Sequence, residues 1–252
     1  MIRLGDAEAF GFETDRVGQA VLAADRERRA RIWWGHSVAD EQVYRSVASP
    51  FVDAVMDADL LGVPNIFRLL RDMELVGDKG SLEELSTTAR SLVIIFDSLK
   101  RHVQEKRLTI EAKILVDERC HERLFSPDNT RKFIAAAERT VVISCYSQDN
   151  ISAGLEAPID AHIEIPPHNQ IRSRLGKDDP SEPSMLQDFP RLLAEVERRI
   201  KPGDLVLVAA GFLGKILIHA AKKKGGVALD CGAAADYWIG MKTRLSSDFI
   251  WR

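Results

Sequence analysis

The pattern of apolar and polar positions predicts a short strand at the start of the chain and helices through the next hundred residues. Ile2 and Leu4 alternate with Arg3 and Gly5, which is typical of an extended segment ending near Asp6. The spacing of apolar residues then predicts helices over residues 15–31, 40–61, 63–76 and 81–106. The segment IWWGHS, residues 32–37, interrupts the first two helices and is compatible with a short strand.

The start of the last of these helices carries a capping signal. Ser81 is followed three residues later by Glu84, which is the spacing of a capping box. We therefore expect a helix to begin at Ser81.

From Glu111 onward, strand-like and helix-like segments alternate. Strands are expected over residues 111–117, 140–145, 160–166, 204–210 and 226–230, and helices over residues 127–139, 186–200 and 213–224. Residues 171–190 hold three prolines and many charges, which predicts a mobile loop. The pattern indicates an α/β fold of Rossmann-like type, a mostly parallel sheet with helices on both faces. We expect one domain over residues 1–252, with a helical insertion at about residues 40–106.

Composition and charge exclude several classes of protein. With 252 residues, of which 45% are hydrophobic, the chain can bury a large core. A formal charge of −3 gives no reason to expect nucleic acid as a partner. Cys120, Cys145 and Cys231 lie far apart without a C-x-x-C pair, so neither a disulfide framework nor a zinc knuckle is indicated. Without a signal peptide or an apolar run long enough to span a bilayer, a cytoplasmic location is expected.

Two carboxylates lie two residues apart at the expected end of the first strand. In an extended segment, Asp6 and Glu8 would share a face with Ile2 and Leu4 and would emerge beyond the carboxyl end of the sheet. Ligands bind at that end in open α/β sheets. The pair could therefore hold Mg²⁺ or Mn²⁺ while a diphosphate supplies the remaining oxygens. The alternative interpretation is a solvated edge.

Similar acidic pairs occur elsewhere in the chain, in segments expected to be helical. Residues two apart on a helix do not face each other, so these pairs are interpreted as solvated helix faces. They are Asp25 with Glu27, Asp57 with Asp59, and Asp72 with Glu74.

A glycine-containing turn near the end of the chain is the second candidate site. A buried strand runs into Gly211, a tight turn passes Gly214, and a helix follows whose N-terminus and Lys215 could receive a phosphate. Asp230 follows 19 residues after Gly211, where a dinucleotide-binding fold places its ribose-binding acid. However, Ala209 replaces the first glycine of that fingerprint, and the alternative is a helix that simply packs closely on a sheet. The turn could also meet the acidic pair across a cleft.

Several motifs resemble those of the bacterial glycosyltransferases of GT-D fold and their GT-D-like relatives. The opening RLGDAE, residues 3–8, is similar to that family's R-[FL]-G-D-x-E, and DADLLGVP, residues 57–64, also matches. LVAAGFLGKIL and ALDCGAAADYWIG, within residues 207–240, resemble the family's ending of strand, glycine turn, helix and a-l-D-[IC]-G-x-x-x-D-x-W-x-G. The resemblance covers most of the chain in order, and its two ends are the specific parts.

The resemblance implies a glycosyltransferase that moves a sugar from a nucleoside-diphosphate sugar to a glycan or glycoprotein acceptor. It implies that Asp6 and Glu8 hold a divalent cation, Mn²⁺ or Mg²⁺, together with the diphosphate. The family more often has glycine where this chain has Ala7, and that methyl group could restrict the turn. The further residues assigned to nucleotide-sugar binding are Arg3, Gly5, Gly211, Gly214, Lys215, Asp230, Gly232, Asp236 and Trp238.

The candidate for the base that takes the proton of the acceptor hydroxyl is His121. It lies just after a predicted strand, close to Asp117 and Arg119. His162 is interpreted as a packed strand residue. His168, Arg172 and Arg174 lie beside the expected loop and are interpreted as an exposed basic segment. Trp33 and Trp34 could stack on a base or sugar, although adjacent tryptophans are usually part of a core.

Two other functions compatible with the sequence are a non-catalytic nucleotide-binding module and, more remotely, an NAD-linked or methyl-transfer enzyme. Both would bind their ligand at the Gly211–Gly214 turn. In either case the acidic pair Asp6 and Glu8 would be dispensable.

Overall fold

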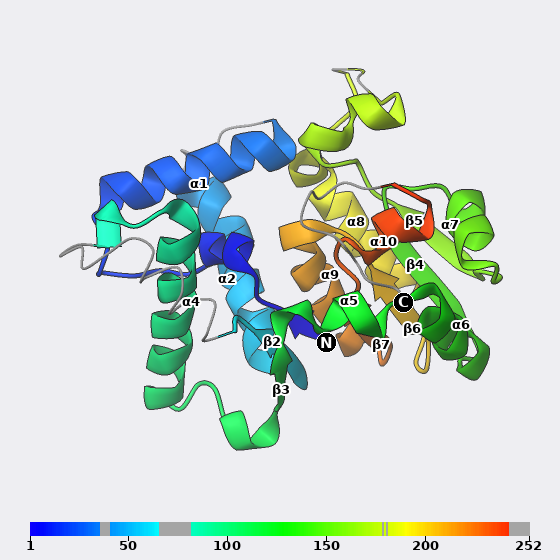
Figure 1. The fold of residues 1–252 in the computed structure, drawn as a ribbon, viewed down its shortest axis with the longest axis horizontal. Helices are drawn as coiled ribbons and strands as arrows, with labels where there is room; N and C mark the ends of the chain where they lie inside the picture. The colour runs from blue at the N-terminus through cyan, green and yellow to red at the C-terminus, as the bar shows by residue number, and fades with distance from the viewer. Residues whose placement is uncertain (36–40, 66–81, 178, 180, 242–252) are drawn as a thin grey trace. The chain divides into compact units, whose positions relative to one another are not determined.

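The computed structural model describes residues 1–35, 41–65, 82–177, 179 and 181–241 (Figure 1). The chain forms two compact units, each with its own parallel sheet. The N-terminal unit comprises Ile2–Glu118 with His168–Gln170, and the C-terminal unit comprises Met1, Arg119–Pro167 and Ile171–Arg252. The α/β class with parallel strands is confirmed. One domain over residues 1–252 stays a prediction.

The sheet of the N-terminal unit has three strands in the order β1, β2, β3, all parallel. They are β1 (Ile2–Arg3), β2 (Leu60–Val63) and β3 (Ile114–Asp117). The chain crosses from β1 to β2 through η1 (Asp6–Gly11), α1 (Gln19–Trp34) and α2 (Glu41–Asp57). It crosses from β2 to β3 through η2 (Leu82–Glu84), α4 (Thr87–Gln104) and η3 (Ile110–Ala112). The segment expected as an insertion therefore holds helical crossovers of a parallel sheet.

The turn η1 is anchored by an aromatic core. It packs against α1, α2 and α4, and Phe10 lies edge-to-face with Trp33, Trp34 and Tyr44 at ring centroid distances of 5.4 to 5.6 Å. Such edge-to-face contacts add to the free energy gained from burying the rings. The two tryptophans thus belong to the core that holds η1 in place.

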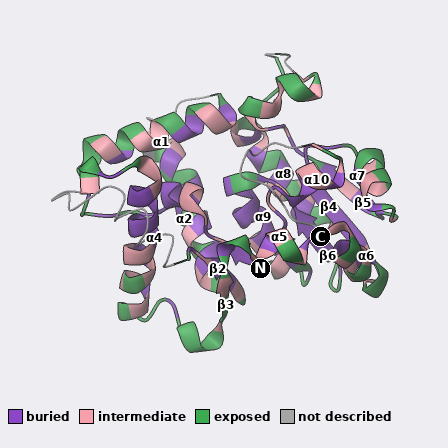
Figure 2. Cartoon of the chain, viewed as in Figure 1, coloured by how far each residue is buried: buried purple, intermediate pink, exposed green. Residues whose placement is uncertain are grey.

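The C-terminal unit contains a four-stranded parallel sheet in the order β5, β4, β6, β7. Its strands are β4 (Thr140–Ser144), β5 (Ala161–Glu164), β6 (Leu205–Val208) and β7 (Val227–Asp230). All residues of β4 and β6 are buried, as Figure 2 shows for β4, which is typical of central strands covered on both faces. The backbone of Met1 bonds to β7, through Ala228 O at 2.7 Å and Asp230 N at 3.2 Å.

The direction of the crossovers places helices on both faces of this sheet. The helices are α6 (Pro127–Ala136), α7 (Gln148–Leu155), α8 (Met185–Arg199) and α9 (Gly211–Lys223). The connection from β4 to β5 runs in the opposite direction to those from β5 to β6 and from β6 to β7, so right-handed crossovers put α7 on one face and α8 and α9 on the other. In agreement, α8 packs against α9, and α6 against α7.

Serine residues form the N-caps of α4, α6, α7 and α8. Ser126, Ser147 and Ser184 accept backbone N–H groups at the starts of α6, α7 and α8, and Ser86 does so for α4 at 3.2 Å. An N-cap serine satisfies one of the amide groups that have no partner within the helix. The predicted cap Ser81 lies outside the described residues, and the described helix begins after Ser86.

The prediction of helix through Leu61 was wrong, because α2 ends at Asp57 and Leu60 opens β2. Four consecutive apolar or glycine residues give no periodicity that separates a buried strand from the end of a buried helix. For the same reason the helix predicted from Val63 does not begin there, since Val63 closes β2. The rest of that helix, residues 66–76, lies outside the described residues.

Other boundaries also differ from the pattern. Ile32–Trp34 is the last turn of α1, which ends at Gly35 with φ of 71°, while residues 36 and 37 lie outside the described part of the chain. The pattern missed α7, whose eight residues carry only two buried apolar positions. The expected loop at residues 171–190 holds a short 3₁₀ turn, Ser173–Leu175, and the first six residues of α8.

No helix among the described residues is long and apolar enough to cross a membrane.

We expect Gly154→Ala to destabilise the C-terminal unit. A methyl group on Gly154, in α7, would overlap the carbonyl oxygen of Trp238, the last residue of α10 (Ala234–Trp238). Overpacking of this kind costs about 1–3 kcal/mol, which urea unfolding followed by circular dichroism would measure. The exposed neighbour Ala153→Ser provides the control, and equal stability of the two variants would contradict this packing.

Candidate functional site

The turn after β1 holds the acidic pair, but not in the geometry expected from an extended chain. Asp6 and Glu8 lie in η1, a 3₁₀ helix with about three residues per turn. Residues two apart therefore point to different sides. The Asp6 side chain is 37% exposed, whereas Glu8 is only 7% exposed. The expectation that both carboxylates emerge on one face with Ile2 and Leu4 was wrong.

The Glu8 side chain is fixed by the backbone of the same turn. Its Oε2 accepts a hydrogen bond from the N–H of Gly5 at 2.8 Å, and the N–H of Glu8 donates to Gly5 O at 3.1 Å. This reciprocal contact closes the start of η1 as a capping glutamate does. The sequence RLGDAE thus folds so that its second acid is turned inward.

A third carboxylate, Glu118, faces the same glycine and was missed by sequence reasoning. Glu118 directly follows β3 and is 6% exposed. A methyl group at Gly5 would lie 3.0 Å from Glu118 Oε2 and 3.3 Å from Glu8 Oε2. Gly5 has an ordinary extended conformation, so the crowding of these two oxygens, rather than backbone strain, is the reason for a glycine here. We refer to Asp6, Glu8 and Glu118 as the carboxylate cluster.

The sheet register explains why Glu118 reaches this turn. Strand β2 lies between β1 and β3, with Gly62 opposite both Arg3 and Val116. A methyl group at Gly62 would lie 3.1 Å from Arg3 Cγ and 3.3 Å from Glu118 Cα. Arg3 Nη1 also donates to Glu118 O at 3.1 Å. The available signal was position alone, since Glu118 follows the carboxyl end of a strand.

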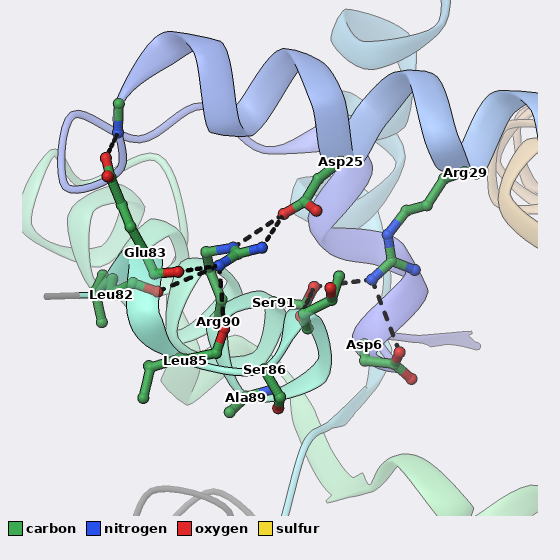
Figure 3. Close-up of polar contacts among 12 residues, drawn as sticks. Asp6, Asp25, Arg29, Leu82, Glu83, Leu85, Ser86, Ala89, Arg90 and Ser91 are labelled. Carbon is green, nitrogen blue, oxygen red and sulfur yellow. Dashed lines mark hydrogen bonds and ion pairs between the residues drawn. The ribbon is translucent and has the colours of Figure 1, made fainter. Parts of the chain in front are cut away.

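A buried arginine from α1 faces Asp6 of the cluster (Figure 3). Arg29 Nη2 lies 3.8 Å from Asp6 Oδ2 and donates to Ser91 Oγ of α4 at 2.8 Å. Burial lowers the pKa of Arg29 below its usual value, while Asp6 and Glu8 act in the opposite direction. A fixed positive charge, which was not predicted from the sequence, therefore lies beside the carboxylate cluster.

The chemistry of the cluster suits a hard divalent cation that shares its ligands with a bound anion. Carboxylate oxygens are the ligands that Mg²⁺ and Mn²⁺ prefer. Among the described residues, no group of three or more His, Cys, Asp or Glu side chains is arranged to hold a metal ion. A cation here would use one or two of these carboxylates and take its other oxygens from a ligand such as a diphosphate, as Mg²⁺ commonly does.

The glycine turn lies in the C-terminal unit, where its charged residues bind one another. Gly211 has φ of 56°, a conformation that favours glycine, and opens α9. Lys215 Nζ lies 3.0 Å from Asp230 Oδ2 and donates to Gly211 O at 3.2 Å. Both side chains are 4% exposed. The structure thus places Lys215 and Asp230 in a buried ion pair that links α9 to β7.

The remaining residues of the C-terminal motif also make internal contacts. Tyr146 donates to Asp236 Oδ1 at 2.6 Å, and burial together with Asp236 raises the pKa of Tyr146. Trp238 donates through Nε1 to Phe125 O at 2.9 Å and is buried. Gly232 has a positive φ of 53° just before α10. These contacts hold the last helix of the described chain in place.

The candidate base His121 is buried, while arginines near it and in the basic segment make contacts within the protein. His121 begins α5 (His121–Leu124) in the C-terminal unit and is buried, and its catalytic role stays a prediction. Arg119 forms a two-bond ion pair with Glu122 at 2.7 and 2.8 Å. Arg172 donates to the carbonyl oxygens of residues 179, 182 and 183, which folds its own loop. His162 Nε2 lies 3.2 Å from Ser144 Oγ, as expected for a packed strand residue.

Of the other acidic pairs, Asp25 is not simply solvated. Its carboxylate binds Arg90 of α4 at 2.9 Å, and Arg90 is buried. Asp72 and Glu74 lie outside the described residues.

Comparison of the chain with protein-family models, with curated proteins and with solved structures finds no match.

We expect Lys215→Met to destabilise the protein by about 3–5 kcal/mol, because it removes a cation that pairs with the buried Asp230 carboxylate. Urea unfolding would measure the loss. Lys223→Met, an exposed lysine of the same helix, is the matched control. If Lys215→Met were as stable as the control but lost affinity for inorganic phosphate, Lys215 would instead be a ligand-binding residue.

Proposed function

We propose that this protein is a divalent-cation-dependent glycosyltransferase that takes its sugar from a nucleoside-diphosphate sugar. The observation that carries the proposal is the carboxylate cluster at the carboxyl ends of β1 and β3, with Glu8 and Glu118 directed at Gly5 and Asp6 on the same turn. The resemblance of RLGDAE to the opening motif of GT-D enzymes supports the same assignment. The acceptor would be a glycan or glycoprotein.

The reaction explains why such a cluster is useful. Sugar transfer breaks the bond between the sugar and the diphosphate, and negative charge develops on the leaving diphosphate. A bound cation supplies positive charge that stabilises this group. Asp6 and Glu8 are the proposed cation ligands, of which the cation would use one or both, and Glu118 would add a further negative charge close to the site.

The chain contributes preorganisation. Glu8 is held by Gly5 N–H, Glu118 is fixed at the end of β3, and Asp6 lies beside Arg29. Side chains that are already positioned lose little conformational entropy when ligand binds. The buried pair of Lys215 and Asp230 gives less support to the glycine turn as a phosphate site, because their charges already compensate each other.

The first test is a thermal-shift panel of nucleoside diphosphates and their sugar conjugates, each with and without Mn²⁺. A ligand at about 100 times its dissociation constant adds about 2.7 kcal/mol, or about 5–11 °C in melting temperature for a protein of this size. We expect stabilisation only with metal, and its loss in the double variant Asp6→Asn/Glu8→Gln. The amide oxygen introduced by Glu8→Gln can still accept the Gly5 N–H, so the turn should still form.

The control for this panel carries the same change in charge at exposed carboxylates of the N-terminal unit, Asp53→Asn/Glu111→Gln. It should keep the full metal-dependent shift. Stabilisation by a nucleotide, NAD or a methyl donor without metal, unchanged in Asp6→Asn/Glu8→Gln, would contradict the proposal. That result would favour a ligand site at the Gly211 turn.

Glu118→Gln tests the additional carboxylate separately. The variant removes one negative charge and retains the shape of the side chain, so we expect Mn²⁺ affinity in the presence of diphosphate to fall by about tenfold or more. Isothermal calorimetry would measure it. Asp117→Asn is the control, because the neighbouring Asp117 accepts a hydrogen bond from Asn65 at 2.8 Å, which asparagine can preserve. Equal affinities in both variants would remove Glu118 from the cation site.

A further inference from the structure

Two arginines are about equally buried, since Arg29 of α1 is 8% exposed and Arg90 of α4 is 7% exposed. Their polar contacts differ (Figure 3). A buried guanidinium is stable when acceptors satisfy its five N–H donors.

Arg90 is saturated. Its Nε and Nη2 bind Asp25 Oδ2, each at 2.9 Å. Its Nη1 donates to the carbonyl oxygens of Leu82, Glu83 and Leu85 at 3.5, 3.0 and 3.1 Å. Arg90 therefore has a structural role, in which it ties the start of α4 to α1.

Arg29 is not saturated. Among the described residues it makes one hydrogen bond, from Nη2 to the neutral Ser91 Oγ, and its ion pair with Asp6 is long, at 3.8 Å. Nε and Nη1 have no hydrogen-bond partner within the described parts of the chain. Trp33 lies nearby, with its ring 5.9 Å from the guanidinium carbon. This buried cation faces Asp6 with donors that an anion could use.

Arg29 would repel a cation that binds to the Asp6 carboxylate. A divalent cation on Asp6 would share that carboxylate with Arg29, so two positive charges would meet in a poorly solvated place. An anionic diphosphate contacting both would remove the repulsion, because guanidinium groups bind phosphate oxygens through paired N–H donors. Cation and diphosphate would then favour each other.

We propose that Arg29 binds the diphosphate and makes tight binding of the divalent cation conditional on it. This inference rests on the proposed function, since it takes the carboxylate cluster as the cation site. It adds a ligand-binding residue and an order of affinities: the cation alone binds weakly, and the cation with a diphosphate binds tightly. By linkage, the cation strengthens diphosphate binding by the same factor.

The test measures three dissociation constants by equilibrium dialysis: Mn²⁺ alone, inorganic pyrophosphate alone with chelator, and Mn²⁺ at saturating pyrophosphate with free Mn²⁺ held by a metal buffer. For the wild type we expect Mn²⁺ to bind about 10- to 100-fold more tightly with pyrophosphate. A wild-type ratio near one would overturn the inference without any variant.

Arg29→Met should separate ligand binding from a structural role. We expect Mn²⁺ alone to bind about threefold or more tighter, and Mn²⁺ with pyrophosphate to bind about tenfold weaker. A structural role would weaken both together. Methionine should be tolerated, because the Asp6 side chain is 37% exposed and is not left as a buried charge, and Ser91 Oγ keeps its bond to Thr87 O at 2.7 Å.

Further variants distinguish this inference from the proposed function. Arg29→Lys keeps the charge and should recover part of the coupling, whereas Arg31→Met, an exposed arginine of the same helix, should leave all three constants unchanged. If Asp6→Asn/Glu8→Gln abolishes binding while Arg29→Met does not change the coupling, only the role of Arg29 is overturned. If Asp6→Asn/Glu8→Gln leaves the constants unchanged, the proposed cation site itself is overturned.

Discussion

The burial of charge beneath the turn that follows β1 is the constraint on which the candidate site depends. Glu8, Glu118 and Arg29 are each less than a tenth exposed. Ionised groups at such depth are stable only with hydrogen bonds or opposite charges nearby. The amide of Gly5 meets this requirement for Glu8 within the turn, and Ser91 of α4 accepts a hydrogen bond from Arg29. The charges are therefore positioned by the fold before any ligand arrives.

The helices around the turn have complementary roles. Aromatic side chains of α1 and α2 enclose Phe10 and hold η1 from its apolar side. The pair of Asp25 and Arg90 joins α1 to the start of α4, while Glu83 accepts the N–H of Gly18 at 2.9 Å just before α1. These contacts hold α1 and the segment at the start of α4 rigidly together. Preorganised sites generally depend on such supporting contacts.

In the C-terminal unit, the residues of the predicted glycine turn and of the motif after it make contacts within the unit. Lys215 and Asp230 neutralise each other, Asp236 accepts a hydrogen bond from Tyr146, and Trp238 bonds to the backbone of Phe125. These residues stabilise the packing of α9, β7 and α10. Each of these side chains therefore has a structural role in this unit.

The sequence by itself determined the α/β class and six of the seven strands in the described chain, because alternation and apolar runs are local properties. It did not identify β2, whose short apolar run has no period of its own, and it misjudged the orientation of Asp6 and Glu8, because a 3₁₀ turn replaced the extended chain. Only the tertiary structure brought Glu118 to Gly5, 113 residues earlier in the chain, and Arg29 to Asp6. Such contacts depend on sheet register and helix packing, which residues distant in sequence decide together.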